Sequence, residues 1–89
     1  MANVWIPSSL YRLTGNQRIV EVAGGTVAEV VDNLDRMFPG IKAELVEGED
    51  LIPGIAAIVN GEQSLMGLLE YVQEDAELHF LPAIGGGEA

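Results

Sequence analysis

The first 22 residues alternate between apolar and polar positions in a pattern that predicts two strands joined by a turn. An apolar series begins at Val4 and is extended by Leu10 and Leu13, with polar residues between them. Residues 14–17 read Thr-Gly-Asn-Gln, which is turn chemistry, and residues 18–22 alternate again as Arg-Ile-Val-Glu-Val. We therefore expect a β-hairpin over this segment.

Three residues of this segment need an interpretation of their own. Pro7 has no backbone N–H to donate to a strand ladder, so we expect it at a bulge or on an unpaired side of the first strand. Trp5 and Tyr11 are candidates for an exposed binding surface, but aromatic residues in strands more often pack against their neighbours. We interpret both aromatic residues as packing residues.

The apolar spacing changes after residue 25 and predicts a helix. Thr26 and Glu29 have the spacing of a capping box, in which the hydroxyl and the carboxylate each accept from a backbone N–H that the first helical turn leaves unpaired. Apolar residues then recur at intervals of three and four and share one stripe: Val27, Val30, Val31, Leu34 and Met37. The stripe must pack against a sheet, and a Pro-Gly pair at 39–40 ends the helix.

The segment after this helix is expected to return to the sheet. Ile41 and Leu45 suggest one further helical turn, followed by a loop at 47–50. The apolar run at 55–59 is rich in β-branched residues and reads as a buried strand. An Asn-Gly pair follows at once, and this pair is a strong signal for a two-residue hairpin turn.

The last part of the chain is less regular. Residues 63–71 combine leucines at helical spacing with a glycine at 67, so we expect a short strand or an irregular segment with a helical turn. Residues 78–81 alternate as a final strand that ends at Pro82. The order of elements predicts an α+β fold, with one main helix across one face of a mixed sheet of about four to five strands.

Length and composition limit the chain to one small domain. The 89 residues are 48% hydrophobic, which excludes a disordered chain, and no apolar run approaches the roughly 20 residues of a membrane helix. The first six residues have no basic region ahead of their apolar residues, as a secretory signal would have. We expect a cytoplasmic protein with a single domain over residues 1–82.

The charge of the chain narrows the choice of partners. Fourteen acidic residues against four basic ones give a formal net charge of −10, which opposes approach to nucleic acid and to anionic lipid. We predict that neither is a partner. A basic protein surface fits better, although high negative charge also serves solubility alone. There is no cysteine, so disulfides and thiolate metal sites are impossible.

No self-contained catalytic site is evident in the sequence. His79 is the single histidine, and we interpret it as a satisfied or solvent-facing imidazole, not as a metal ligand or a general base. The serines form no recognisable triad with it, and the carboxylates at 47–50 lack the spacing of a calcium loop. We therefore predict no catalytic residue, no metal site and no cofactor bound by this chain.

Residues 81–89 are the stretch that indicates a function. They read Leu-Pro-Ala-Ile-Gly-Gly-Gly-Glu-Ala. Because glycine has no Cβ, such a segment can lie extended in a narrow cleft, close to another protein's reactive groups. On composition alone, a frayed terminus is the alternative. We expect residues 83–89 to form a flexible tail.

This ending resembles the C-terminal signature of the ubiquitin-like sulfur carriers of the MoaD/ThiS family. In that signature an apolar residue, one or two prolines, a β-branched residue and a small residue precede a terminal Gly-Gly. In the same register Gly86 and Gly87 are the diglycine. Ala83 stands where many members have a second proline, and Glu88-Ala89 follow the diglycine where most members stop.

The resemblance also has consequences for the fold. The predicted order of elements agrees with the ubiquitin-like β-grasp fold, and the resemblance extends over nearly the whole chain. Family members often have Asp-Gly-Asp in the turn before the last strand. Asp75 occupies the glycine position here, so the resemblance implies a left-handed backbone conformation at this residue.

The resemblance implies a protein cosubstrate and not an enzyme. In the family, an adenylating enzyme related to the ubiquitin activators uses ATP and magnesium to activate the terminal glycine, a sulfurtransferase or persulfide delivers sulfur, and a synthase accepts it. The residues that carry over are Gly87 for adenylation and the thiocarboxylate, Gly85 and Gly86 for threading into the partner, and Leu81, Pro82 and Ile84 for partner docking.

Several functions remain open at this stage. The length and the tail resemble the molybdopterin and cysteine carriers more than the shorter thiamine type. Activation would first require removal of Glu88-Ala89, for which some family systems use a zinc-dependent, deubiquitinase-like metalloprotease. The alternatives are a protein modifier that is conjugated to lysines and a non-catalytic β-grasp binding module.

Overall fold

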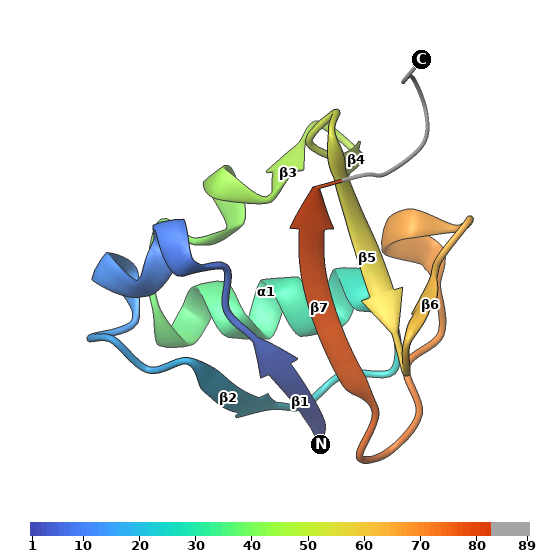
Figure 1. Ribbon diagram of the computed structural model, residues 1–89, viewed down its shortest axis with the longest axis horizontal. Helices are drawn as coiled ribbons and strands as arrows, with labels where there is room; N and C mark the ends of the chain where they lie inside the picture. Colours follow the sequence, from blue (N-terminus) through green and yellow to red (C-terminus); the bar gives the residue numbers. More distant parts are fainter. Residues whose placement is uncertain (83–89) are drawn as a thin grey trace.

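The computed structural model describes residues 1–82, and the predicted tail at 83–89 lies outside the described residues. Figure 1 shows a sheet with a single α-helix behind it. The elements are β1 (Ala2–Trp5), η1 (Ser8–Leu13), β2 (Ile19–Val22), α1 (Val27–Met37), η2 (Lys42–Glu44), β3 (Val46–Glu47), β4 (Asp50–Leu51), β5 (Ile55–Val59), β6 (Glu62–Gln63), η3 (Gly67–Leu69) and β7 (Glu77–Pro82), where η denotes a 3₁₀ helix. Within residues 1–82, no helix has the length and apolar content to cross a membrane.

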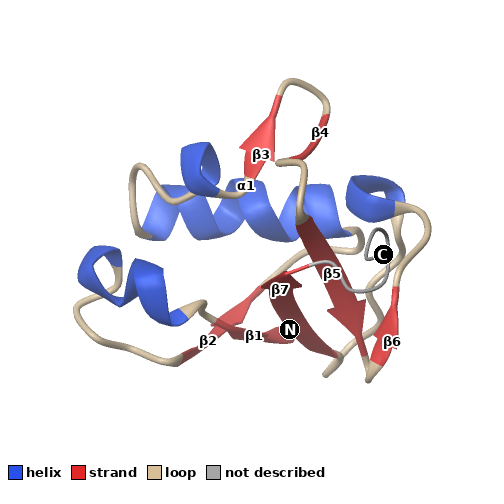
Figure 2. Ribbon diagram, turned by 45° about the horizontal axis from the view of Figure 1, so that its top comes forward, coloured by secondary structure: helices blue, strands red, loops and turns tan. Residues whose placement is uncertain are grey.

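The main sheet has five strands in the order β2-β1-β7-β5-β6. The central pair, β1 and β7, is parallel, and the other three pairs are antiparallel. α1 crosses one face of this sheet (Figure 2). The predicted α+β class and the mixed β-grasp sheet with one main helix are therefore confirmed.

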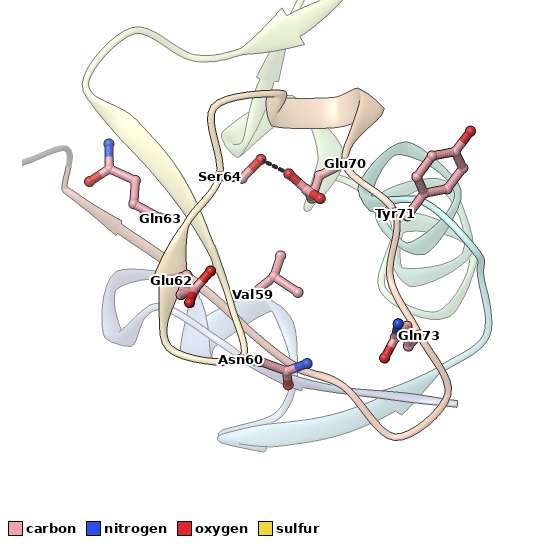
Figure 3. Close-up of a pocket in the computed structure, with 8 residues that line it drawn as sticks. All are labelled: Val59, Asn60, Glu62, Gln63, Ser64, Glu70, Tyr71 and Gln73. Carbon is pink, nitrogen blue, oxygen red and sulfur yellow. Dashed lines mark hydrogen bonds between the residues drawn. The ribbon is translucent and has the colours of Figure 1, made fainter.

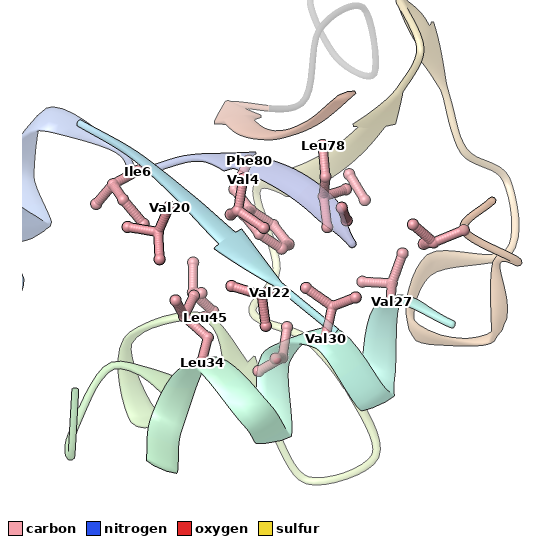
Figure 4. Close-up of a cluster of buried hydrophobic side chains, with 14 of the residues drawn as sticks. Val4, Ile6, Val20, Val22, Val27, Val30, Leu34, Leu45, Leu78 and Phe80 are labelled. Carbon is pink, nitrogen blue, oxygen red and sulfur yellow. The ribbon is translucent and has the colours of Figure 1, made fainter. Parts of the chain in front are cut away.

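The strands direct alternate side chains toward α1. In β7, Leu78 and Phe80 are buried, and in β1, Val4 is fully buried. Figure 4 shows these side chains facing Val30 and Leu34 of the helix, both of which are fully buried. Because successive residues of a strand point to opposite faces, this face of the sheet supplies the layer of the core that packs against α1.

The start of α1 follows the predicted capping box, with a small difference in its partners. Thr26 Oγ1 accepts a hydrogen bond of 3.2 Å from the backbone N–H of Glu29. The Glu29 carboxylate accepts one of 2.8 Å from Gly25, one residue before the cap. Gly24 has φ +147° and lies so close to the helix that an added Cβ would meet Val30 at 2.8 Å. The helix is thus fixed tightly against the preceding turn.

The predicted stripe of α1 is buried except at its end. Met37 is 49% exposed, so its place on the buried stripe was wrong. Met37 is the last residue of α1, at the end of the stripe. Ile41 and Leu45, which flank the short helix η2, are fully buried and fill the core beyond the end of α1. The further helical turn predicted there is confirmed.

The connection between β1 and β2 differs from the predicted simple hairpin. The two strands do pair antiparallel, with Trp5 opposite Ile19, but Leu10 and Leu13 belong to the 3₁₀ helix η1 and not to a strand. Pro7 lies before η1 and not within the ladder. A spacing of three matches the three residues per turn of a 3₁₀ helix, and this turns Leu10 into the core.

The segment 47–50 also departs from the prediction. It was expected as a loop, but Val46–Glu47 and Asp50–Leu51 form a small antiparallel pair of their own. Gly48 has φ +66°, which allows the tight reversal between them. β3 and β4 do not join the main sheet. Their backbone N–H and C=O groups find hydrogen-bond partners by pairing with each other.

The remaining turns agree with the sequence. Asn60 and Gly61 have φ values of +51° and +86° and connect β5 to β6, as the Asn-Gly pair predicts. Asp75 has φ +63°, so the left-handed conformation implied by the family resemblance is confirmed. Residues 63–71 contain the end of a short strand and the single turn of η3.

Candidate functional site

The base of the tail is held by the last strand of the sheet. β7 lies between β1 and β5, and its last two residues, Leu81 and Pro82, are opposite Ala56 and Ile55 of β5. Leu81 is 44% exposed and Pro82 is exposed. Because Phe80 points into the core, Leu81 points to the opposite face. The two predicted docking residues in the described part are therefore accessible.

The other predicted site residues lie outside the described residues. These are Ile84, Gly85, Gly86 and Gly87, together with the extension Glu88-Ala89. Their roles in docking, threading and thiocarboxylate formation stay predictions. What the structure provides is the position and direction from which the chain leaves the sheet.

A hollow of about 310 Å³ lies at this exit point. Its lining comes from the start of η1, the turn before β5 and the end of β7: Pro7, Ser8, Ser9, Gly54, Ile55, Phe80, Leu81 and Pro82. Most of these groups are apolar, and the two serines contribute hydroxyls. The hollow could receive an apolar side chain of a protein that holds the tail.

A row of apolar and aromatic side chains crosses the sheet face that α1 leaves uncovered. The strand register places Ile19 opposite Trp5, Trp5 beside His79, and His79 opposite Ile58. Ile19 is 50% exposed, and the other three are partly exposed. We call these residues and Leu81 the open face. It is continuous with the base of the tail because Leu81 is on β7, two residues after His79.

The two rings at the centre of the open face are stacked. The centroids of Trp5 and His79 are 4.6 Å apart, with an angle of 16° between the ring planes. Trp5 does pack, on His79, but both rings are partly exposed on the face that α1 leaves uncovered, so Trp5 also belongs to the candidate binding surface. Tyr11 is in η1, not in a strand, and the Arg18 guanidinium lies 5.6 Å from its ring centroid.

Sequence reasoning missed the open face as a unit. Alternation in β7 was enough to place His79 and Leu81 on one side of the strand. No local signal indicated that β1 would lie on one side of β7 and β5 on the other. Trp5 and Ile58 become neighbours of His79 only through this strand order.

The single histidine lies at the centre of the open face. His79 Nε2 lies 3.8 Å from Glu77 Oε1, and one face of its ring stacks on Trp5. Within residues 1–82, no group of three or more histidines, aspartates and glutamates is arranged to hold a metal ion. The arrangement offers a partner an apolar contact area next to the exit of the tail.

A five-stranded mixed sheet crossed by one helix, with its last strand leading to a Gly-Gly sequence, defines a ubiquitin-like β-grasp protein with a carrier-type ending. The chain belongs to the ThiS family, whose match covers residues 4–87. This match includes Gly86 and Gly87 and stops before Glu88. The family resemblance stated from the tail is thereby confirmed. No curated protein sequence matches the chain.

Solved structures support the same assignment. A chain of the BexX/CysO complex from Amycolatopsis orientalis is 38% identical, with a TM-score of 0.88 and coverage of 98% of this chain and 100% of that one. CysO from Mycobacterium tuberculosis is 27% identical, with a TM-score of 0.85 and coverage of 94% and 100%. SAMP1 from Methanosarcina acetivorans, at 24% identity, a TM-score of 0.76 and coverage of 97% and 95%, shows the shared fold.

Proposed function

We propose that this protein carries sulfur as a thiocarboxylate on Gly87. The observation that carries the proposal is the family match, which runs from the first strand through the diglycine. The described fold supports it, because an apolar contact area lies beside the point where the chain leaves the sheet. Residues 83–87, if fully extended, would span at most roughly 18 Å beyond Pro82. That reach suits entry into an enzyme's active site.

The chemistry follows from the reactivity of a main-chain carboxylate. A free carboxylate is a poor acyl donor because its leaving group would be oxide. In the proposed reaction, an oxygen of the Gly87 carboxylate attacks the α-phosphate of ATP, and pyrophosphate leaves. The terminal sulfur of a persulfide on the sulfurtransferase then attacks the carbonyl carbon of the acyl adenylate, a C–S bond forms, and AMP leaves. A second thiol of the partner cleaves the S–S bond of this acyl disulfide, which releases the thiocarboxylate and leaves a disulfide on the partner. ATP and magnesium belong to the adenylating partner.

The proposal assigns the protein the role of cosubstrate. The partners are an adenylating enzyme, a sulfurtransferase and a synthase that accepts the sulfur. Among the described residues, Leu81 and Pro82 dock the partner, together with the open face. Ile84 extends this contact, and Gly85 and Gly86 thread the partner's channel.

The carboxyl of Gly87 must first be freed from Glu88-Ala89. We assign this step to a metalloprotease that cleaves after Gly87. Such cleavage fits the family match, which ends at this residue.

Cysteine synthesis is the pathway that we favour over molybdopterin synthesis. Two CysO structures are 38% and 27% identical to this chain over nearly its full length. The tail sequence by itself fits both pathways. Deletion of the gene should therefore impair sulfur incorporation into cysteine and leave molybdoenzyme activity intact, whereas the opposite phenotype would assign the carrier to molybdopterin.

Intact-mass analysis of the protein from its native cells tests the carrier mechanism. We expect a species that ends at Gly87 and a second one with the mass change of one oxygen replaced by sulfur. A Gly87→Ala variant should lack the second species and still be folded. If the native cells contain only a form that retains Glu88 and Ala89, the mechanism is wrong.

A second candidate is a protein modifier conjugated to lysines. It is favoured by the similarity to SAMP1 from Haloferax volcanii, named a small archaeal modifier protein, at 25% identity and a TM-score of 0.70. Lysine conjugates that survive a denaturing gel would support it. A chain without residues 86–89 should lose function under both candidates, whereas a binding module that does not use the tail would keep it.

A further inference from the structure

A short segment at the edge of the sheet exposes four apolar side chains. Leu65 is 95% exposed, Tyr71 77%, Leu69 70% and Met66 56%. We call these four residues the apolar ridge. Single exposed apolar residues are common on soluble proteins, but contiguous ones are typical of an interaction surface, and Leu65, Met66 and Leu69 line one hollow together.

The backbone of the apolar ridge is fixed by hydrogen bonds. Ser64 Oγ accepts from the N–H groups of Met66 at 2.9 Å and Gly67 at 3.1 Å. It also donates to Glu70 Oε1 at 2.6 Å, a bond visible in Figure 3. Leu68 is buried against the core and anchors the turn from below. The exposed side chains are therefore displayed on an ordered support, which lowers the entropy lost on binding.

The ends of the segment are tied to the start of α1. The carbonyl of Glu70 accepts from the N–H of Val27 at 2.9 Å, and the N–H of Val72 donates to the carbonyl of Gly25 at 3.0 Å. Backbone hydrogen bonds thus connect the C-terminal end of the ridge to the start of the helix. A partner bound to it would be held in a fixed orientation relative to the tail exit.

Two hollows with acidic groups adjoin the ridge. One of about 380 Å³ contains the carboxylates of Glu62 and Glu70 (Figure 3), and its lining also includes Tyr71 of the ridge. The other, of about 480 Å³, includes Glu49 and Asp50, together with the ridge residues Leu65, Met66 and Leu69. Neither lining contains a lysine or an arginine.

Basic side chains are confined to another part of the sequence. Arg12, Arg18, Arg36 and Lys42 are the four basic residues, and residues 43–82 contain none. The same stretch carries the carboxylates of Glu44, Glu47, Glu49, Asp50, Glu62, Glu70, Glu74, Asp75 and Glu77. The two hollows beside the ridge are lined by carboxylates and by no lysine or arginine, so an occupant that combines apolar groups with positive charge complements them.

We propose that the apolar ridge docks a basic amphipathic segment of a second protein. Its apolar side chains would pack on Leu65 and Leu69, and its lysine or arginine side chains would pair with Glu62 and Glu70. The inference goes beyond the proposed carrier function, because it uses neither the tail nor the open face. A protein bound here can remain attached while the tail is inside an enzyme.

Charge argues against two other occupants. A second copy that docks through its own ridge would place the carboxylates of both copies at one contact, where the linings of the hollows offer no lysine or arginine to pair with them. An anionic lipid surface would be repelled in the same way. The basic protein segment is the occupant whose chemistry complements both the apolar groups and the charge.

The proposal is tested by NMR titration of the ¹⁵N-labelled full chain with a synthetic amphipathic helical peptide of leucine and lysine. We expect amide shifts concentrated at residues 62–71. The paired variant Leu65→Ser/Leu69→Ser should weaken binding by about tenfold or more, since both side chains are truncated at the contact. Glu62→Lys should weaken binding as well, and less so at high salt because the ion pair is screened.

Matched controls distinguish binding at the ridge from general attraction of a basic peptide to an acidic protein. Met37→Ser removes an exposed apolar side chain elsewhere, Glu21→Gln removes an exposed carboxylate on β2, and Trp5→Ala changes the open face. None of the three should alter peptide binding. A leucine-glutamate peptide of the same length should not bind.

Other results would overturn the proposal. Shifts spread equally over the carboxylates of α1, or centred on the open face, would show that residues 62–71 have no special role. Tight binding to vesicles of phosphatidylglycerol would mean that the ridge binds a lipid surface and not a basic segment. A dimer in sedimentation equilibrium that Leu65→Ser/Leu69→Ser dissociates would mean that the occupant is a second copy of this chain. If removing residues 83–89 shifts the ridge amides as strongly as the peptide does, the occupant is this chain's own tail and the proposal fails.

Discussion

The two faces of the five-stranded sheet are built from alternating residues of the same strands, and they differ sharply in burial. On the covered face, Val4 and Leu78 are fully buried beneath α1. On the open face, the next residues along the same strands, Trp5 and His79, stack on each other at the surface. Ile19 and Leu81 of the open face are about half exposed.

This difference in burial assigns the covered face to stability and the open face to recognition of a partner. Burial of the covered face removes apolar area from water and drives folding. The open face gains little from folding, so its apolar side chains remain available for a partner. Substitutions on the two faces should therefore have different readouts: a loss of stability on one, and a loss of carrier activation on the other.

The largest effect is expected for Leu34→Ala on the helix that covers the sheet. Leu34 is fully buried, and truncating such a leucine costs about 2–5 kcal/mol of the free energy of unfolding. Urea denaturation measures it. Met37→Ala on the same helix, at an exposed site, should stay within about 0.5 kcal/mol of the native chain. Equal losses for the two variants would contradict the assigned burial.

Trp5→Ala should act mainly on function. Truncating an aromatic residue at the centre of a contact area often weakens binding by about tenfold or more. We expect a corresponding fall in the fraction of chains that carry the proposed Gly87 thiocarboxylate in native cells, measured by intact mass and normalised to protein level. Met37→Ala again serves as the control. If the Trp5→Ala chain is converted to the thiocarboxylate at the normal level, the open face is not part of the docking surface.

A smaller effect is expected at the start of α1. Thr26→Ala removes the acceptor for the Glu29 N–H and should cost about 1 kcal/mol of stability. Thr26→Ser retains a hydroxyl and should recover most of it. Thiocarboxylate conversion per folded chain should be unchanged, because the cap lies away from the open face. Reduced thiocarboxylate formation by the folded Thr26→Ala chain would contradict the assignment of stability to the covered face and of recognition to the open face.

The smallest effect concerns an ion pair at the sheet end, outside both faces. The Glu74 carboxylate accepts a hydrogen bond from the Met1 amine and raises the pKa of this amine above its ordinary value of 8.0. A raised folded-state pKa means that the stabilisation is fully present below pH 8.0 and is lost as pH rises through the folded pKa. Both groups are exposed, so solvent screens the effect.

Chemical denaturation at a series of pH values tests this pair. The native chain should lose slightly more stability than Glu74→Gln as pH rises above 8.0. Glu49→Gln, an exposed carboxylate in another turn, should follow the native curve. Identical curves for the native chain and Glu74→Gln would mean that the pair contributes nothing to stability.

Much of the fold was predictable because its signals are local. The hydroxyl of Thr26 and the spacing from Val27 to Leu34 define a capped amphipathic helix regardless of what packs on it. Asn60-Gly61 specifies a turn through its own backbone preferences. The alternation of residues 78–81 defines a strand with one apolar face.

The errors arose where the local pattern fits more than one structure. The spacing of Leu10 and Leu13 fits an interrupted strand, and it also fits a 3₁₀ helix that turns Leu10 into the core. Only packing over the sheet favours the 3₁₀ helix. Met37 lies at the edge of a helical stripe, where burial depends on which neighbour fills the space. The pairing of Val46–Glu47 with Asp50–Leu51 has no strong signal in such short strands.

The sequence by itself determined the capped helix, the alternating strands, the charge and the Gly-Gly ending, because each depends on residues close together along the chain. Only the tertiary structure decided that β7 lies between β1 and β5, which brings Trp5, His79 and Ile58 into one row. It also decided that Leu68 turns inward while Leu65 and Leu69 turn outward. The physical reason is that these contacts join distant segments, and their formation depends on the packing of the whole core.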